Sequence, residues 1–370
     1  MGSWFNNLKK GTFMEKFNIS LSDKIGNNFL LEALHDTDFD NRTGYDKNFL
    51  GIEVPLPQIT DKITDLVGTN PNPSANGANY LDYTHFSILF NKSKKLPFAT
   101  AVNIQGLTNE LGNVHETRDG DTWYQDNRIF ENRITNQFNN NDYRGSGFQK
   151  GHMVRYYDPA WGENMEIKKK AIGDTFHFTN CCPQLRALNV GDWLNLENYT
   201  MARALFQDEK VTVFSGPIFK NALQIEMLLV PVNFWKIVVY KKENTLEAIG
   251  FLLSQQLVYN KMIQESLIVE TDKEYSNPTL KKEDIDKLFN KKNLKGYMVK
   301  IEELEEKTGL SFGLNSFDLN KNKNQHFFEK LVPTSPLPEI TERFKGIMKY
   351  IEFNESIEEH FDDAEFIKNM

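Results

Sequence analysis

The residues best suited to chemistry are concentrated between Arg118 and Glu197. Within this stretch, His152 ends the run GSGFQKGH, whose glycines let the backbone turn tightly and approach a ligand, and Lys150 lies two residues before it. A neutral histidine, with a pKa of about 6.5, can take a proton from an attacking water. A single histidine is more often a hydrogen-bonded structural residue, so His152 alone does not establish a catalytic site.

Asn189 and Glu197 form a second candidate pair, because they lie eight residues apart in a segment with helical periodicity. Eight residues differ by about 80° around an α-helix, so both side chains can face one side, but they are roughly 12 Å apart along its axis. One small ion therefore cannot bind both directly, and one must act through water. Such a site leaves most positions around the metal to water and phosphate oxygens, which suits Mg²⁺. Asparagine is also a favoured helix N-cap, and the spacing alone slightly favours that structural role for Asn189.

The elements that must position these residues are predicted from hydrophobic periodicity. Short runs rich in β-branched and aromatic residues predict strands at residues 83–90, 98–104, 211–214, 234–240 and 246–253, with a shorter β-like piece at 175–179. A helix that begins near Asn189 is predicted by apolar residues at intervals of three or four, namely Trp193, Leu196, Tyr199, Ala202 and Phe206. Further helices are predicted at residues 61–67, 282–289 and 302–308. The pattern indicates an α+β fold with a mixed or antiparallel central sheet and flanking helices.

The composition restricts the class of protein. No stretch approaches the roughly 20 apolar residues of a membrane-spanning helix, and the N-terminal residues lack a signal-like apolar run, so we expect a soluble, cytoplasmic protein without a membrane partner. The net charge of −8 and a pI near 5.5 require any nucleic-acid site to be a local basic patch. Cys181 and Cys182 are the only cysteines, and because they are adjacent we expect them to pack rather than to form a disulfide framework.

Several motifs around these residues resemble the DNA/RNA non-specific endonucleases of the ββα-metal type. The family's Asp-Arg-Gly-His motif is similar to QKGH, which ends at His152, and its Thr/Ser-Asn-x-x-Pro-Gln motif to TNCCPQ, which ends at Gln184. The family also has an Asn eight residues before a Glu, with a Trp between, as at Asn189 and Glu197. A looser pattern extends over about residues 80–313. The resemblance implies a ββα-metal motif embedded in the fold.

The resemblance implies a role for each matched residue. His152 is the expected general base, Glu197 the anchor of metal-bound water, and Asn180 and Gln184 the support of the site. An upstream arginine that grips the scissile phosphate matches Arg118, ahead of Trp123 and Asp126, although the gap is longer here; Arg128 is the fallback. The expected catalytic residues are therefore His152, Glu197, Lys150, Arg118 and Asn180. The expected substrate contacts are Arg118, Lys150, Gln184 and Arg128. Asn189 is the expected ligand of the metal ion, which is Mg²⁺ with Mn²⁺ as a substitute.

The family's Asp-Arg pair is replaced here by Gln149 and Lys150. This replacement keeps positive charge near the phosphate but loses the bidentate fork of arginine and a carboxylate. We therefore expect retained chemistry at a lower rate. The net acidity further predicts weaker non-specific nucleic-acid binding at physiological salt than a basic nuclease shows.

The predicted organisation has three parts: an N-terminal extension at residues 1–79 that ends in the turn-rich TNPNPSANGAN, a ββα-metal nuclease domain at 80–340, and an acidic tail at 341–370. The predicted function is Mg²⁺-dependent hydrolysis of DNA and RNA, leaving a 5′-phosphate and a 3′-hydroxyl. A catalytically weak nucleic-acid-binding module and a nuclease specialised for one nucleic acid are the alternatives, because phosphate contacts do not read bases. A non-specific nuclease inside a cell needs restraint, so we expect an inhibitor or an activating partner, and relatives with this pattern are commonly homodimers.

Overall fold

The computed structural model describes residues 38–60, 76–105, 122–131, 137–186, 188–194, 210–225, 227–255 and 297–321, with a few single positions and pairs between these ranges. They belong to one unit of the chain, Leu34–Gly106 together with Thr122–Pro336. Among the helices in these ranges, none is both long enough and apolar enough to cross a membrane.

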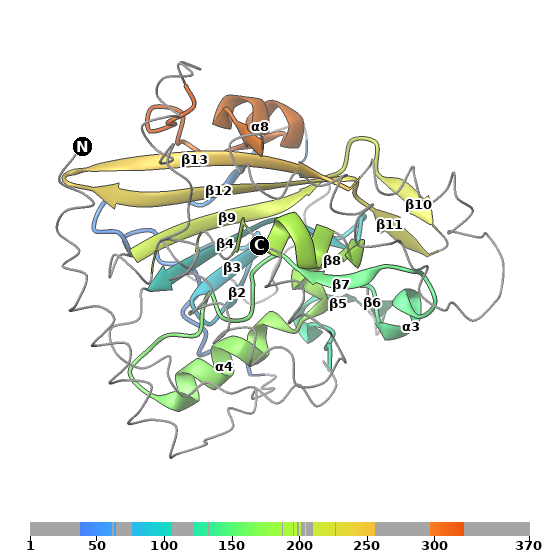
Figure 1. Ribbon diagram of the computed structural model, residues 1–370. Coiled ribbons are helices and arrows are strands. Elements are labelled where there is room, and N and C mark those ends of the chain that lie inside the picture. The colour runs from blue at the N-terminus through green and yellow to red at the C-terminus, as the bar shows by residue number, and fades with distance from the viewer. Residues whose placement is uncertain are drawn as a thin grey trace, which may run out of the picture. The chain divides into compact units, whose positions relative to one another are not determined.

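A seven-stranded sheet organises this unit (Figure 1). All of its neighbouring strands are antiparallel, in the order β14, β13, β12, β9, β4, β3, β2. The long central strands are buried over most of their length, as expected for a sheet covered on both faces. The strand bounds are β2 Tyr80–Tyr83, β3 Phe86–Asn91, β4 Leu96–Gln105, β9 Lys210–Ile218, β12 Asn233–Lys242, β13 Thr245–Ser254 and β14 Met298–Val299.

Four of the five predicted strands are confirmed, at residues 98–104, 211–214, 234–240 and 246–253. The fifth prediction, a strand at 83–90, is confirmed for residues 86–90 but wrong at its start, because the chain turns at Thr84 and His85 to form the β2–β3 hairpin. Asp174 stabilises this turn from a distant part of the chain, since its Oδ2 accepts hydrogen bonds from Thr84 N and Thr84 Oγ1, both at 2.8 Å. His85 adopts a positive φ of 67°. A local apolar pattern carries no information about such a distant partner.

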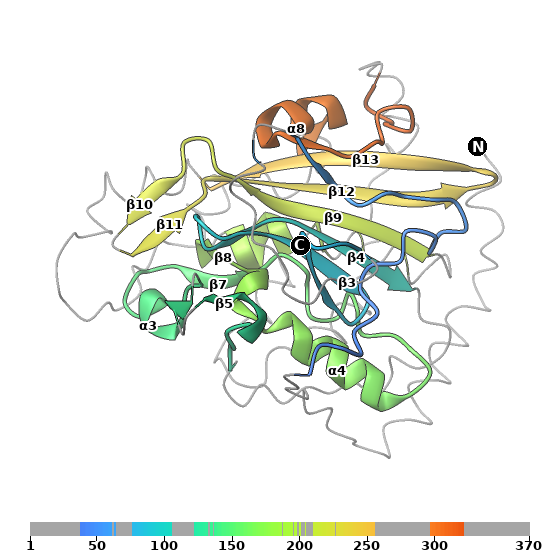
Figure 2. The same cartoon turned by 180° about the vertical axis from the view of Figure 1, so that it is seen from behind.

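One face of the sheet packs against helix α8 (Ile301–Thr308), strand β15 (Leu310–Ser311) and the segment that leads into strand β1 (Gln58–Ile59). β1 and β15 pair antiparallel. Figure 2 shows α8 on the same side of the sheet when the unit is seen from behind. The predicted helix at 302–308 is thereby confirmed, whereas the helices predicted at 61–67 and 282–289 fall almost entirely outside the described residues.

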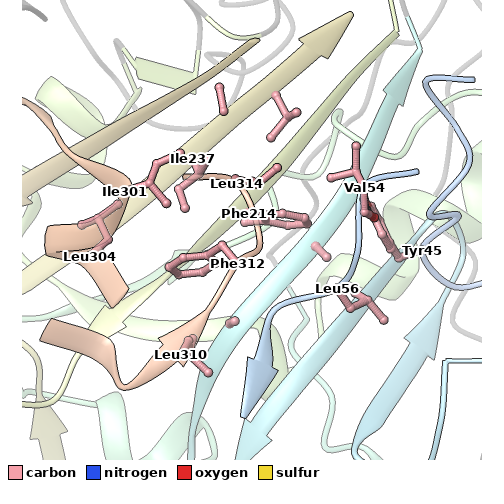
Figure 3. Close-up of a cluster of buried hydrophobic side chains, with 14 of the residues drawn as sticks. Tyr45, Val54, Leu56, Phe214, Ile237, Ile301, Leu304, Leu310, Phe312 and Leu314 are labelled. Atoms are coloured by element: carbon pink, nitrogen blue, oxygen red, sulfur yellow. Dashed lines mark hydrogen bonds between the residues drawn. The ribbon is translucent and has the colours of Figure 1, made fainter. Parts of the chain in front are cut away.

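The hydrophobic core on this face includes residues from the N-terminal part of the chain. Figure 3 shows Tyr45, Val54 and Leu56 in one cluster with strand residue Phe214 and with Phe312 after β15. All five are buried. The described part of residues 1–79 is therefore a component of the central core and not a separate extension. The remaining residues before Asp38 and the acidic tail at 341–370 lie outside the described residues, so their roles stay predictions.

The opposite face carries the segments that contain the candidate site (Figure 1). Strand β7 (Gln149–His152) pairs with β8 (Cys181–Gln184), and helix α4 (Met165–Thr175) runs between them in the chain. The chain then forms a helical segment that starts with η5 (Leu188–Asp192) and continues to Glu197. The smaller elements are η3 Asn127–Ile129, β5 Phe130–Glu131, β6 Ile134–Thr135, α3 Asn140–Tyr143, η4 Phe178–Asn180, β10 Leu223–Ile225 and β11 Leu228–Val230. The α+β fold class is confirmed.

The β-like piece predicted at residues 175–179 is wrong. Thr175 ends α4, and residues 178–180 form η4. Polar side chains fold the chain back here, because Asn180 Nδ2 donates to Thr175 O at 2.9 Å and His177 Nδ1 lies 2.9 Å from Asp174 O. Threonine and phenylalanine favour strands by propensity, but these local contacts outweigh that preference.

Candidate active site

The candidate site is built on the β7–β8 hairpin. In its register Gln149 lies opposite Gln184, and His152 lies opposite Cys181. Strand side chains alternate between faces, so Lys150 and His152 share one face of β7 while Gln149 and Gly151 share the other. The chain then continues from β8 into the helical segment at Leu188, which completes the ββα order that the resemblance implies.

His152 is half-buried in an aromatic setting. Its ring centroid lies 4.5 Å from that of Trp123 and 4.9 Å from that of Phe176, with Phe176 edge-on. The Lys150 Nζ lies 5.7 Å from the centroid of the same Trp123 ring, and it donates to Asn140 Oδ1 at 2.9 Å. Trp123 therefore holds the imidazole and the ammonium group on one side of the hairpin.

Carboxamide groups gather on the other face of the hairpin. Asn189 Nδ2 donates to Gln149 Oε1 at 2.9 Å, which ties the helical segment to β7. The Gln184 side chain lies across Gly151, where an added Cβ would stand 2.0 Å from Gln184 Oε1. Both polar atoms of the Gln184 amide are buried without a hydrogen-bond partner among the described residues. A buried amide of this kind is costly unless water or an ion completes its hydrogen bonds.

Asn189 does not act as the helix N-cap that its spacing also allowed. It lies within Leu188–Asp192, and its own N–H donates to Leu185 O at 3.0 Å. Because its side-chain nitrogen is directed to Gln149, its side-chain oxygen points the other way. That oxygen is the kind of neutral ligand that Mg²⁺ accepts.

Glu197 follows on the same helical segment and is 6% exposed. Its Oε1 lies 3.9 Å from Nζ of Lys236, a buried residue of strand β12. The inward side of the segment matches the predicted periodicity at Trp193 and Leu196, which are fully buried. Tyr199, Ala202 and Phe206, which complete the predicted periodicity, lie outside the described residues.

Asn180 supports the site instead of contacting substrate. Its Oδ1 accepts from Val154 N, and its Nδ2 donates to Val154 O and Thr175 O, all at 2.9 Å. The backbone repeats the contact, since Met153 N donates to Asn180 O. With its side chain fully buried and bonded to backbone, Asn180 positions the chain directly after His152 and cannot act as a catalytic group itself.

Arg128 does not fit its predicted role as fallback phosphate contact. Its side chain is 7% exposed, its NH2 group lies 2.7 Å from Asp126 Oδ2, and its NH1 group donates to Asp82 O at 2.8 Å. One face of its guanidinium covers the Phe39 ring at 3.9 Å. Burial acts to raise the pKa of Asp126, but Arg128 outweighs it and lowers that pKa below its usual value. The pair is structural, and Arg118 lies outside the described residues.

Cys181 and Cys182 are buried free thiols, which confirms their packing role. Cys181 Sγ donates to the Tyr143 hydroxyl at 3.2 Å. Burial raises the pKa of Cys181 to about 12, so it stays a thiol at neutral pH. Among the described residues, no three or more His, Cys, Asp or Glu side chains lie together in a group that could hold a metal ion.

Sequence reasoning missed the buried charges beneath the helical segment. Lys236, Arg155 and Asp158 are each at most 3% exposed. A signal for the lysine was present, because it interrupts the apolar run NFWKIVVY, where a strand buried on both faces should contain no charge. Arg155 and Asp158 carry no comparable signal.

Several known proteins are similar in sequence to this chain. An uncharacterised protein of Sinorhizobium fredii is 36% identical over 235 residues, which cover 59% of this chain and 33% of that protein. Human mitochondrial endonuclease G is 31% identical over 147 residues, 35% of this chain and 45% of the relative. The chain thus spans less than half the length of these two relatives. A crystal structure of an EndoG/EndoGI complex aligns with a TM-score of 0.45 and 17% identity, over 69% of this chain and 93% of that one.

The family model for DNA/RNA non-specific endonucleases matches residues 65–318, which is more than half of the chain. The match includes the β7–β8 hairpin and the helical segment that follows it. This chain therefore belongs to the DNA/RNA non-specific endonuclease family.

Proposed function

We propose that this chain is a divalent-metal-dependent endonuclease that hydrolyses phosphodiester bonds in DNA and RNA with little dependence on base sequence. The observation that carries the proposal is the hydrogen bond from Asn189 to Gln149, because it ties the helical segment to the strand that bears His152. The bond places a proposed metal ligand against the strand of a proposed base, although Gln149 and His152 project from opposite faces of β7. Family membership supports the same activity.

His152 is the proposed general base. Its contacts with Trp123 and Phe176 orient the ring, which is partly exposed although its Nε2 atom is buried. Removal of a proton from that water by a positioned imidazole contributes about 10²–10⁴-fold to such reactions. Lys150, on the same face of β7, is the proposed phosphate contact, together with Arg118. The proposed products carry a 5′-phosphate and a 3′-hydroxyl.

Mg²⁺ is the proposed cofactor, with Mn²⁺ as a substitute. The residues fit a hydrated cation, since Asn189 presents its amide oxygen and the buried Gln184 amide offers hydrogen bonds that no described residue uses. When bound, the ion would stabilise negative charge on the phosphate and the leaving oxygen. Asn189 would hold the ion directly, and Glu197 would accept hydrogen bonds from the water around it.

The remaining proposals concern the cell. We propose a cytoplasmic location, an inhibitor or activating partner that restrains the activity, and a homodimeric state. Each is independent of the cleavage chemistry and is tested separately by fractionation, by co-purification and by sedimentation.

Cleavage assays test the proposed activity directly. The chain should cut both plasmid DNA and RNA in the presence of Mg²⁺, and EDTA should stop both reactions. His152→Ala should lower the rate by more than about 100-fold, the scale expected for loss of a general base. Asn189→Ala should lower it as well, whereas Asn141→Ala, at an exposed asparagine of α3, is the matched control and should cut normally.

Other outcomes would select the alternatives. Binding of DNA and RNA without cleavage would favour a nucleic-acid-binding module. Cleavage of only one of the two would favour a specialised nuclease. Cleavage that persists in EDTA, or in the His152→Ala variant, would contradict the proposed chemistry.

A further inference from the structure

Lys236 is a buried cation in the middle of an otherwise apolar strand. Its side chain is 1% exposed, and it lies within β12 between Trp235 and Ile237. Those two neighbours point into the core shared with α8. Because side chains alternate along a strand, Lys236 points to the opposite face of the sheet, where the ββα unit lies.

The ammonium group of Lys236 contacts the helical segment at two places. Its Nζ lies 3.9 Å from Glu197 Oε1 and 4.5 Å from the centroid of the Trp193 ring. Asp158 and Arg155, in the segment that follows His152, also act on it electrostatically. Asp158 Oδ1 is buried without a hydrogen-bond partner in the described part of the chain.

Stability does not account for this lysine. Taking an ammonium group out of water costs several kcal/mol, and replacing a buried ion pair by apolar residues of similar volume is often neutral or stabilising. Methionine has nearly the same volume and would suit the neighbouring side chains of β12. A cation at this position therefore points to a use beyond packing.

We propose that Lys236 is a positioning residue of the nuclease site, which fixes the direction of the Glu197 carboxylate and joins the helical segment to the segment after His152. The inference rests on the proposed function, in which Glu197 accepts hydrogen bonds from water around the metal. Glu197 Oε1 lies at an ion-pair distance of 3.9 Å from Lys236 Nζ, so the attraction acts on one identified oxygen of the carboxylate. The same ammonium group also attracts the Asp158 carboxylate electrostatically.

A double-mutant cycle tests the proposal. Lys236→Met should lower kcat by about 10–100-fold, the range for partners that orient groups around a metal, while KM for DNA stays unchanged. Glu197→Gln should have a similar effect. The double variant should lose little more than the larger single loss, because both changes act through one carboxylate. Lys241→Met, at an exposed lysine of the same strand, is the matched control and should retain full kcat.

Metal binding provides a readout independent of cleavage. In calorimetric titrations with Mn²⁺ and without nucleic acid, Lys236→Met should weaken binding by about 10-fold, and Lys241→Met should not. If Lys236→Met fails to fold, the Lys236→Met/Asp158→Asn variant removes one buried charge of each sign and should show the same losses. Independent, multiplicative effects of the Lys236 and Glu197 changes, or unaltered Mn²⁺ affinity, would overturn the proposal.

The two proposals fail differently. If the unmodified chain cuts neither DNA nor RNA, the proposed function fails, and the Mn²⁺ titrations still decide whether Lys236 positions the metal site. If the chain cuts normally and Lys236→Met matches it in both kcat and Mn²⁺ affinity, only the role of Lys236 is rejected.

Discussion

Three carboxamides lie together at the β7–β8 hairpin: Gln149, Gln184 and Asn189. Gln149 distinguishes this site from the family motif, because it is neutral. Gln149 stands where the family motif has a carboxylate, and it accepts the hydrogen bond from Asn189. An amide acceptor holds Asn189 without adding negative charge next to the proposed ion. Gly151 is required beside it, because any side chain there would collide with Gln184.

Asp158 shows how the buried charges respond to pH. Burial raises its pKa to about 6, and Lys236 and Arg155 limit that rise. Because the folded protein binds this proton more tightly than the unfolded chain does, Asp158 favours folding below about pH 4 and that contribution is lost as the pH rises towards about 6. From 3.8 to about 6, at roughly 1.4 kcal/mol for each tenfold change in proton affinity, the change is about 3 kcal/mol.

Asp158→Asn should remove this pH dependence. The free energy of unfolding of the unmodified protein, measured relative to the variant by guanidinium titration, should fall by about 3 kcal/mol between about pH 4 and pH 7. Parallel stability curves for the two proteins across that range would show that Asp158 has an ordinary pKa.

At the scale of elements, residues 45–59 pack against the seven-stranded sheet as part of its hydrophobic core. Tyr45 donates to Val54 O at 2.9 Å and its backbone N–H donates to Ser87 Oγ of β3 at 2.8 Å. β1 then pairs with β15 from the far end of the described chain. Two segments more than 200 residues apart in sequence thus close the same core.

Leu56→Ala tests whether this segment is integral to the fold. A buried leucine replaced by alanine costs about 2–5 kcal/mol, so the main unfolding transition should shift by that amount. Glu53→Ala is the matched control in the same segment, because Glu53 forms an exposed ion pair with Lys47 whose loss should cost about 1 kcal/mol or less. An unchanged main transition in Leu56→Ala would mean that residues 45–59 fold independently of the sheet.

At the scale of the whole molecule, a net charge of −8 opposes binding to a polyanion. The proposed substrate contacts must therefore overcome repulsion between the acidic protein and the nucleic acid. We expect the protein's lysine and arginine side chains to neutralise few phosphates. Affinity for nucleic acid depends on salt through the number of phosphates contacted, so a shallow dependence is expected.

Lys150→Met should make that dependence shallower still. In anisotropy titrations of labelled DNA with EDTA present, the slope of log affinity against log salt should decrease by about 1 when one phosphate contact is lost. Lys307→Met, on α8 across the sheet, is the control and should leave the slope unchanged. An identical slope for Lys150→Met would exclude Lys150 as a phosphate contact.

The sequence by itself determined the features that depend on local pattern. Alternating and apolar runs predicted four strands of the sheet, and periodicity predicted α8 and the helical segment near Asn189. The resemblance of its motifs to the endonuclease family implied that His152 and Asn189 belong to one ββα unit. These predictions succeed because side-chain period and motif spacing are properties of neighbouring residues.

Tertiary structure alone decided the features that depend on distant partners. Asp174 accepts a hydrogen bond from Thr84 N and so stabilises the turn at Thr84 and His85. Asp126 forms a buried ion pair with Arg128. Lys236 meets Glu197 only because the sheet and the helical segment pack together. Whether a charged side chain is a surface contact or a buried anchor depends on the residues that remove water from around it, and folding brings those residues from elsewhere in the chain.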